Sequence, residues 1–432
     1  MLLVFTHKIT PRLTYIFKHI FLRILNVPVD FTTKIETFVA HKGPKITYTK
    51  APLGKEFFVR NNSLLFEQGV GDPNIEVELW ENIPCFFKTG EKSGIPFDIF
   101  AASFYLMTRY EEYQPHVADA YGRFDAKQSL AYKHNFLNQP VIDIWAYKLL
   151  DKLKEKYPDY HFEPRQYKRL SIININKAFA YKHKGIIRNI GGFFSDLAQM
   201  NFRSIARRFL VLTGFRKDPF DTFENIISLK KKHNIHTVFF FLYSEYTTFD
   251  TNISFSNRKY GLLIKSIIDY TGFGQLFSHY TMKKGEKLIK EKRRFEDLVN
   301  QPVTKSRQHN NRLDLPQTYQ NLVDNHITED YSMGYNAHPG FRASTCTPFY
   351  FFDLDYEIQT PLKLFPFAVV DETLLIQNKL TTKEAFLKIK TIENEVKKVK
   401  GHFISVFHNT TFSDLQSHKK WGELYENVFS KQ

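Results

Sequence analysis

The chain has 432 residues, 43% of them hydrophobic, so it can bury a large core, and at roughly 150 residues per domain it should form two or three units. Its formal charge of +15 favours polyanionic partners, without distinguishing nucleic acid, anionic lipid and acidic glycan. The two cysteines, Cys85 and Cys346, lie far apart, which argues against a disulfide framework or a thiolate zinc site and fits a reducing compartment.

The N-terminal segment predicts a short strand at residues 2–5 and then an amphipathic helix. Apolar residues recur at helical spacing from Leu13 to Ile24. His7, Lys8 and Arg12 interrupt the apolar run before it reaches signal-peptide length, and no run approaches the roughly 20 residues of a membrane span. We therefore expect a cytoplasmic protein with room for peripheral contact with an anionic surface.

Residues 1–165 predict an α+β unit with strands near 45–48, 57–59 and 75–79, separated by Gly and Pro turns. Residues 97–113, FDIFAASFYLMTRYEEY, predict a helix that is apolar nearly all round and therefore buried. It ends in Arg109, Glu111 and Glu112, which could form a binding site, although an ion-paired anchor between domains is the favoured interpretation.

From about residue 170, short apolar strands alternate with helices. Strands are expected at 169–176, 236–242, 362–370 and 401–409, and a helix at 382–400 that Gly401 should stop. This alternation predicts a parallel sheet, open or closed into a barrel. Basic residues gather at 203–216 and 283–294, and the second stretch is typical of the solvated face of a helix. Neither accompanies a nucleic-acid motif, so no specific nucleic-acid partner is predicted.

In parallel α/β folds, chemistry collects at the carboxyl ends of strands, because the loops there carry polar groups while the strands stay packed. The positions that this rule selects are Asn174 and Asn176, residues 275–279, 306–309 and 340–342, Asp371, and His408 with Asn409.

Several long strings carry a resemblance to a known family. They include PFDIFAASFYLMTRYEEY and GRFDAKQSLAYKHNFLNQPVIDIW in the first third, and SRQHNNRLDLPQTY, EDYSMGYNAHPGFRAS, PFAVVDETL and FISVFHNTTF later. With them the chain resembles the polysaccharide deacetylases of carbohydrate esterase family 4, in the Bacteroidetes version with its own N-terminal domain. The resemblance implies an α/β chain: an N-terminal α+β domain at residues 1–165 and a distorted deacetylase-type (β/α) barrel at residues 166–432.

The chemistry implied is metal-assisted amide hydrolysis. One carboxylate and two imidazoles hold a divalent ion, a second carboxylate takes a proton from water, and a late histidine protonates the departing amine. The family's first motif, Asp-x-Asp, corresponds to Asn174-Ile175-Asn176. An amide is a weak neutral ligand and takes up no proton near neutral pH, so both roles of this motif should fail.

The family's first histidine ligand falls on Leu276 or on Phe277, depending on the end from which the motif is counted. Neither side chain can bind a metal. His279 could reach the same space if its loop were rearranged, or it could be a plain loop histidine. His309 matches a family histidine and is either a remaining ligand or a group that hydrogen-bonds a strand end, the structural role being favoured.

The rest of the implied site is present. Arg342 matches the arginine that orients the proton acceptor, and it could instead bind an anion or form a buried ion pair. Asp371 matches a later acidic motif and could hold His408, the expected general acid. The same resemblance assigns substrate binding to Tyr335, Phe341 and Asn409.

These features predict a catalytically impaired deacetylase, a pseudoenzyme that needs no cofactor and binds a saccharide or a partner in cell-envelope glycan metabolism. The alternative is an active N-deacetylase that binds zinc through a rearranged site of His279, His309, His408 and Asp371. A third hypothesis, binding of nucleic acid or anionic lipid through the charge excess, predicts affinity that falls steeply with salt.

Overall fold

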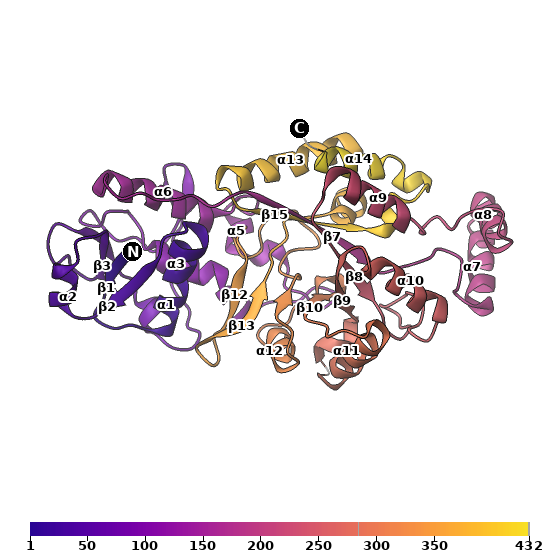
Figure 1. Cartoon of the computed structure of the whole chain (residues 1–432), viewed down its shortest axis with the longest axis horizontal. Coiled ribbons are helices and arrows are strands. Elements are labelled where there is room, and N and C mark those ends of the chain that lie inside the picture. Colours follow the sequence, from indigo (N-terminus) through magenta and orange to yellow (C-terminus); the bar gives the residue numbers. More distant parts are fainter. Residues whose placement is uncertain (284, 431–432) are drawn as a thin grey trace. The chain divides into compact units, whose positions relative to one another are not determined.

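The computed structural model describes residues 1–283 and 285–430, which form a mixed α/β structure with parallel sheets (Figure 1). They divide into two compact units. The first contains Met1–Lys168, Leu313–Ala368 and Thr391–Ile404, and the second contains Arg169–Arg312, Val369–Lys390 and Ser405–Gln432. The chain therefore returns to the first unit twice. The boundary expected between domains at residues 1–165 and 166–432 stays a prediction.

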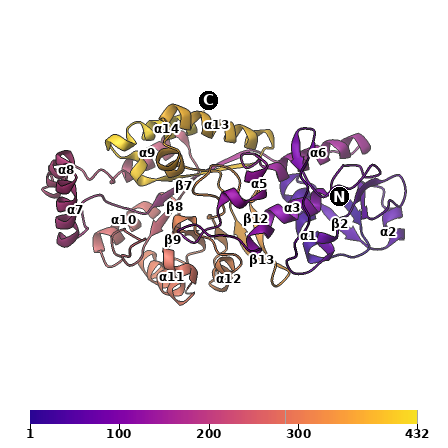
Figure 2. The ribbon, with the colours of Figure 1, turned by 180° about the vertical axis from the view of Figure 1, so that it is seen from behind.

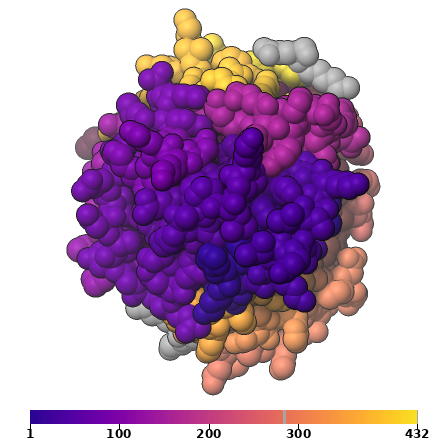
Figure 3. All heavy atoms as spheres, turned by 90° about the vertical axis from the view of Figure 1, so that its left-hand side faces the viewer, coloured from indigo at the N-terminus to yellow at the C-terminus, as the bar shows by residue number. Residues whose placement is uncertain are grey.

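The first unit is built around a parallel sheet with the strand order β2-β1-β3-β4. The strands are β1 (Leu2–Phe5), β2 (Val29–Thr32), β3 (Lys45–Thr49) and β4 (Phe57–Arg60). Three of them coincide with strands expected from the sequence. Atoms of the first 170 residues, in indigo to magenta, cover most of the face that Figure 3 shows.

The predicted amphipathic helix consists of α1 (Pro11–Phe17), which continues directly as the π-helix η1 (Lys18–Ile24). The helix begins where the Thr10 hydroxyl accepts a hydrogen bond from the Leu13 amide, and Pro11 has no N–H that would need an acceptor. Its apolar residues, Leu13, Ile16, Phe17, Ile20, Phe21 and Ile24, are at most 1% exposed. This apolar face packs inside the unit, so it is not available to a peripheral surface.

The buried helix predicted at residues 97–113 is confirmed as α3 (Ile99–Met107) followed by α4 (Tyr110–Tyr113). Every residue of α3 is buried, and the Asp98 carboxylate caps it by accepting the amides of Phe100 and Ala101. Arg109 separates the two helices in the left-handed conformation, with φ 58°. The other main elements of the unit are β5 (Glu78–Trp80), β6 (Ile83–Cys85), α6 (Val141–Lys156), α12 (Gln317–Asp324), β11 (Glu329–Asp330), β12 (Phe349–Asp353) and β13 (Ile358–Leu364).

In the second unit the strands run in the order β10-β9-β8-β7-β15-β14. They are β7 (Lys168–Ile175), β8 (Thr237–Leu242), β9 (Gly272–Phe277), β10 (Lys305–Gln308), β14 (Val369–Val370) and β15 (His402–His408), of which β15 has its residues 402–404 in the first unit. The pairs from β7 to β10 are parallel, as is β14 with β15, which confirms the parallel sheet. Residues 239–241 of β8 are fully buried, as expected of a strand covered on both faces.

The helices of the second unit are α7 (Ile186–Ala198), α8 (Phe202–Leu212), α9 (Phe223–His233), α10 (Arg258–Ile268), α11 (Gly285–Val299) and α14 (Trp421–Phe429). In Figures 1 and 2, α9 and α14 lie on one side of β7 and β8, while α10 and α11 lie on the other. Most of the basic stretch at 283–294 falls in α11, as predicted, while Lys284 lies outside the described residues. α13 (Thr382–Lys398) runs from the second unit into the first.

Three local predictions are wrong in detail. The strand expected at 75–79 occupies only Glu78–Trp80. Residues 362–370 form the end of β13 and, after an interruption at Pro366, the short β14, because proline cannot donate to a ladder. Gly401 follows Lys400, which itself takes the left-handed conformation with φ 47°. The glycine is required instead because a Cβ there would lie 2.2 Å from the Cys346 sulfur.

Among the described residues, no helix is long and apolar enough to cross a membrane. Both cysteines, Cys85 and Cys346, are buried and free.

Candidate functional site

The second unit contains a pocket of about 290 Å³ at the carboxyl ends of its strands. Side chains reach it from the segments that follow β7, β8, β10, β14 and β15. Its lining consists of Asn176, Lys177, Phe220, Phe249, Thr251, His309, Asn310, Glu372, Ile376, His408, Asn409, Thr410 and His418. Of the predicted site residues, Asn176, His309, His408 and Asn409 therefore share one pocket.

His408, the last residue of β15, forms a pair with Asp371. Its Nδ1 lies 2.6 Å from the Asp371 Oδ1 atom, and its backbone amide donates to Oδ2 over 2.7 Å. The Thr411 hydroxyl and the Glu372 amide also donate to this carboxylate. Asp371 is fully buried, and these four donors compensate for its desolvation. The predicted support of His408 by Asp371 is thus present in the geometry.

The charge of His408 depends on its neighbours. Burial lowers the pKa of the imidazole, but the carboxylates of Glu372 and Asp371 outweigh that effect, and the pKa is raised above its ordinary value. The side-chain amide of Asn174 lies on the other side of the ring, with Nδ2 3.4 Å from Nε2. A protonated Nε2 needs an acceptor, which Asn174 supplies if its amide presents Oδ1.

A second histidine–aspartate pair borders the same pocket. His309 Nδ1 lies 2.7 Å from Asp250 Oδ1, and the same carboxylate accepts the Thr247 hydroxyl and the His279 amide. Although burial raises the pKa of Asp250, its hydrogen bond and charge interaction with His309 bring it below the usual value. This contact fixes the ring at the end of β10, and because ligand histidines are oriented by carboxylates in the same way, both roles considered for His309 stay predictions.

The metal-ligand role considered for His279 does not fit its surroundings. The guanidinium of Arg312 lies 3.1 Å from His279 Nε2 and also donates to the His279 carbonyl. The ring stacks on Phe249, with centroids 4.0 Å apart. A permanent cation therefore occupies the position that a dication would need beside this imidazole.

The residues present do not make up a metal centre. Among the described residues, no group of three or more His, Cys, Asp or Glu is arranged to hold an ion. Asn174 and Asn176 supply amides, and their buried Oδ1 atoms have no hydrogen-bond partner within the described structure. Such a neutral donor set does not offset the charge of a divalent cation.

The strand register places Leu276 and Phe277, the two candidate positions of the missing histidine ligand, on opposite faces of the sheet. Asn174 pairs with Phe240, and Phe240 pairs with Gly274, so these residues share one face of the sheet. Leu276, two residues beyond Gly274, lies on that face as well, whereas Phe277 points to the opposite face. Both are at most 1% exposed.

Arg342 lies in the first unit, where it forms a buried ion pair with Glu112. Its Nε donates to Glu112 Oε1 over 2.8 Å, and its terminal nitrogen contacts Oε2. Arg109 donates to the same carboxylate over 2.7 Å and also pairs with Glu111. Burial raises the pKa of Glu112, but the two guanidinium groups bring it down to about 2. This network matches the ion-paired interpretation of both Arg342 and the end of the 97–113 helix.

The three predicted substrate-binding residues differ in position. Tyr335 and Phe341 are buried in the first unit, where the Tyr335 hydroxyl accepts a hydrogen bond from Arg109 over 2.9 Å. Asn409 borders the pocket of the second unit, and its side-chain amide donates to the carbonyls of Lys177 and Phe220, each over 3.0 Å. Only Asn409 among the three therefore contributes to this pocket.

Several residues near the pocket were not predicted. Asp250 lies in the loop that follows β8. Polar residues after the carboxyl ends of parallel strands are candidates for the site, so this position could have been selected from the sequence. Glu372 is next to Asp371 and lies 3.7 Å from His408 Nε2. Phe220 lies in a turn and His418 ends a short 3-10 helix, and no local sequence signal distinguishes either of them.

A family model matches the N-terminal third of the chain. Residues 2–158 match a family model described as a family of unknown function, DUF7033. The match covers less than half of the chain. No curated protein matches it.

Among solved structures, the chain is distantly similar to a protein from Mycobacterium smegmatis assigned as a polysaccharide deacetylase. The identity is 12% and the TM-score 0.39, over 62% of this chain and 87% of the other. A second similar structure is a mutant of a carbohydrate esterase family 4 pseudoenzyme with restored enzymatic activity, with 12% identity, a TM-score of 0.32 and 62% coverage of both chains. Similarity at this level says nothing about activity.

Proposed function

We propose that this chain is a cytoplasmic, catalytically impaired relative of the polysaccharide deacetylases, with a distorted deacetylase-type barrel as its second part, and that its pocket binds a saccharide in cell-envelope glycan metabolism. The observation that carries the proposal is the asymmetry of the pocket. The His408–Asp371 pair is intact, while the positions that would bind a metal and accept a proton hold the amides of Asn174 and Asn176.

The chemistry of the lining supports a sugar ligand. Amide and imidazole groups hydrogen-bond hydroxyls in either direction, and Phe220 and Phe249 offer apolar ring faces. A volume of about 290 Å³ is at the small end of ligand pockets, so the site suits one sugar unit of a chain rather than several. A charged His408 would donate its Nε2 hydrogen to a sugar hydroxyl in place of Asn174, without any water being activated.

The catalytic half of the proposal is tested by metal analysis and activity. Purified protein, prepared without chelator, should hold no stoichiometric zinc and should not release acetate from acetylated glucosamine oligomers. Metal-dependent turnover that disappears in His408→Ala would establish the rearranged active enzyme instead.

A matched pair of variants asks whether the scaffold still accepts a metal. Asn174→Asp with Asn176→Asp and Leu276→His places two carboxylates and one imidazole on the face shared by residues 174 and 276, and we expect zinc binding by calorimetry. The control replaces Leu276→His with Phe277→His, which places the imidazole on the opposite face. Equal zinc affinity in both variants would contradict the register argument.

The binding half is tested by calorimetry with N-acetylglucosamine oligomers. Ile376 lines the pocket and is 58% exposed, so Ile376→Trp should narrow the opening and weaken binding about tenfold or more without removing a buried contact. Leu387→Trp, at a site 57% exposed and outside the lining, serves as the control. An equal loss in both variants, or no binding by the wild type, would contradict the sugar-binding proposal.

A further inference from the structure

The second unit carries an exposed apolar surface that the pocket does not explain. Residues 186–215, comprising α7, α8 and the residues that follow α8, are called the α7–α8 hairpin here. Every exposed phenylalanine that the structure describes lies in it: Phe193, Phe194, Phe202, Phe209 and Phe215. Ile186 and Ile187 are 78% and 87% exposed. α7 buries none of its residues and α8 buries only Val211.

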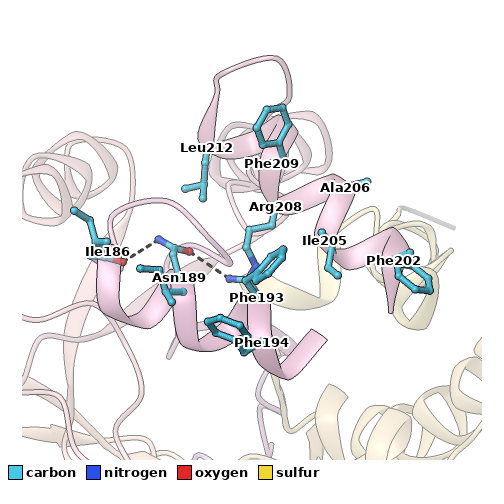
Figure 4. Close-up of a pocket in the computed structure, with 12 residues that line it drawn as sticks. Ile186, Asn189, Phe193, Phe194, Phe202, Ile205, Ala206, Arg208, Phe209 and Leu212 are labelled. Atoms are coloured by element: carbon cyan, nitrogen blue, oxygen red, sulfur yellow. Dashed lines mark hydrogen bonds between the residues drawn. The ribbon is translucent and has the colours of Figure 1, made fainter. Parts of the chain in front are cut away.

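The apolar side chains gather on facing sides of the two helices. They line a groove of about 890 Å³ between α7 and α8 (Figure 4). In α7 they recur at positions 186, 190, 193, 194 and 197, and in α8 at 202, 205, 209 and 212, which is the spacing of one helical face. Both helices are therefore strongly amphipathic, and their apolar faces are exposed rather than packed against the rest of the unit.

Polar contacts hold the two helices in this arrangement. The Arg208 guanidinium of α8 donates to Asn189 Oδ1 over 3.3 Å and to Asp196 over 2.7 Å, both in α7. It can approach because Gly192 has no side chain, and a Cβ there would lie 2.6 Å from the guanidinium. The hairpin is thus formed before any partner covers it, and its apolar residues are free to make contacts elsewhere.

The charges around the groove indicate the chemistry of the partner. Residues 182–217 contain eight lysines and arginines and one acidic residue, Asp196. Carboxylates pair with four of these cations: Asp414 with Arg207 and Arg216, Asp196 with Arg208, and Glu224 with Lys217. The other four, Lys182, Lys184, Arg188 and Arg203, keep the region positive. Arg203 is exposed on α8, and Arg188 and Lys184 lie at the start of α7. A second copy of the hairpin would bring like charges together, which opposes self-association.

We propose that the α7–α8 hairpin docks in the interface of an anionic lipid bilayer. Its isoleucine and phenylalanine side chains enter the boundary of the acyl chains, while the flanking lysines and arginines contact lipid phosphates. The helices lie in the plane of the interface, since neither is long or apolar enough to cross it. The surface is separate from the pocket, so the proposal does not depend on the function proposed above.

The test is flotation of the full-length protein with vesicles of phosphatidylcholine, with and without phosphatidylglycerol. The protein should bind the anionic vesicles, and added salt should weaken binding. The triple variant Ile187→Ser, Phe194→Ser, Phe209→Ser should lower the partition coefficient at least about tenfold, because binding scales with buried apolar area. Arg203→Glu should lower it by a smaller factor.

The control variant changes three comparably exposed residues of the first unit, Leu79→Ser, Val117→Ser and Tyr356→Ser, at 69%, 75% and 69% exposure. It should bind like the wild type. Failure of the wild type to bind anionic vesicles, or an equal loss in the control, would overturn the proposal. So would a dimer in light scattering that the triple variant dissociates, since the groove would then be a contact between copies.

Discussion

A single imidazole, that of His408, shows how neighbouring charges decide protonation in the pocket. Burial alone would leave it neutral, and the carboxylates of Glu372 and Asp371 reverse this. Asp371→Asn should lower the pKa of His408, measured from imidazole NMR shifts against pH. Glu384→Gln, at an exposed carboxylate away from the pocket, should leave the pKa unchanged.

The same pair has a consequence for stability. Because the folded-state pKa of His408 is raised, its stabilising contribution is complete below the unfolded-state pKa of about 6.5 and is lost as the pH rises through the folded-state value. Asp371→Asn should reduce this loss. An unchanged pKa of His408 in that variant would contradict the assigned cause.

Glu291 in α11 provides a second pH-dependent residue. Burial raises its pKa to about 7, although it accepts hydrogen bonds from the Ser278 amide and hydroxyl. The folded protein therefore keeps a proton that the unfolded chain releases near pH 4.5, and stability should fall as the pH rises from about 4.5 to 7. Glu291→Gln can still accept from the Ser278 amide while its NH2 donates to the Ser278 hydroxyl, and it should flatten this slope in thermal unfolding. A wild-type slope of the opposite sign would refute the shift.

Among the elements, the junction of α3 and α4 depends on a buried ion network. Glu112 accepts hydrogen bonds from Arg109 and Arg342, and all three side chains are at most 2% exposed. Glu112→Ala leaves two buried guanidinium groups without their shared partner, and should lower the free energy of unfolding by about 3–5 kcal/mol.

The control for this network is the exposed pair of Lys88 and Glu78, with side chains 70% and 49% exposed. Glu78→Ala should leave the midpoint of urea denaturation nearly unchanged, because solvent screens an exposed ion pair. Similar losses in the two variants would show that the buried network does not stabilise the unit beyond a surface pair.

For the whole molecule, the division of the chain makes the first unit discontinuous. Within that unit, the partners of three buried charges come from residues 313–368: Glu357 for Arg12, Arg342 for Glu112, and Thr345 for Asp143. Residues 1–168 expressed alone should therefore lack a cooperative thermal transition and show red-shifted tryptophan emission, since Trp145 is fully buried in the intact chain.

The reference for this measurement is the full chain carrying Trp421→Phe. Its tryptophan emission comes only from Trp80 and Trp145, the two tryptophans that the fragment also contains. A fragment that melts cooperatively with the emission of the intact chain would mean that the first 168 residues fold independently, as the sequence-based limits imply.

The sequence by itself determined the elements with a strong local signal. The short apolar run at residues 237–242 favours a strand covered on both faces, and the longer run that contains α3 favours a buried helix, because length is what separates buried strands from buried helices. The identity of Asn174 and Asn176 also limits the chemistry of the pocket before any fold is known. Unlike a carboxylate, an amide takes up no proton near neutral pH and is only a weak, neutral metal ligand.

Tertiary structure alone decided which of these residues meet. Arg342 and His408 both lie in motifs that resemble those of an active site. In the structure, Arg342 pairs with Glu112 in the first unit, whereas His408 pairs with Asp371 in the second. Likewise, the helices at residues 11–24 and 186–212 have similar amphipathic patterns, but only the second leaves its apolar face exposed. Periodicity fixes the side of a helix that is apolar, whereas long-range packing decides whether the same chain covers it.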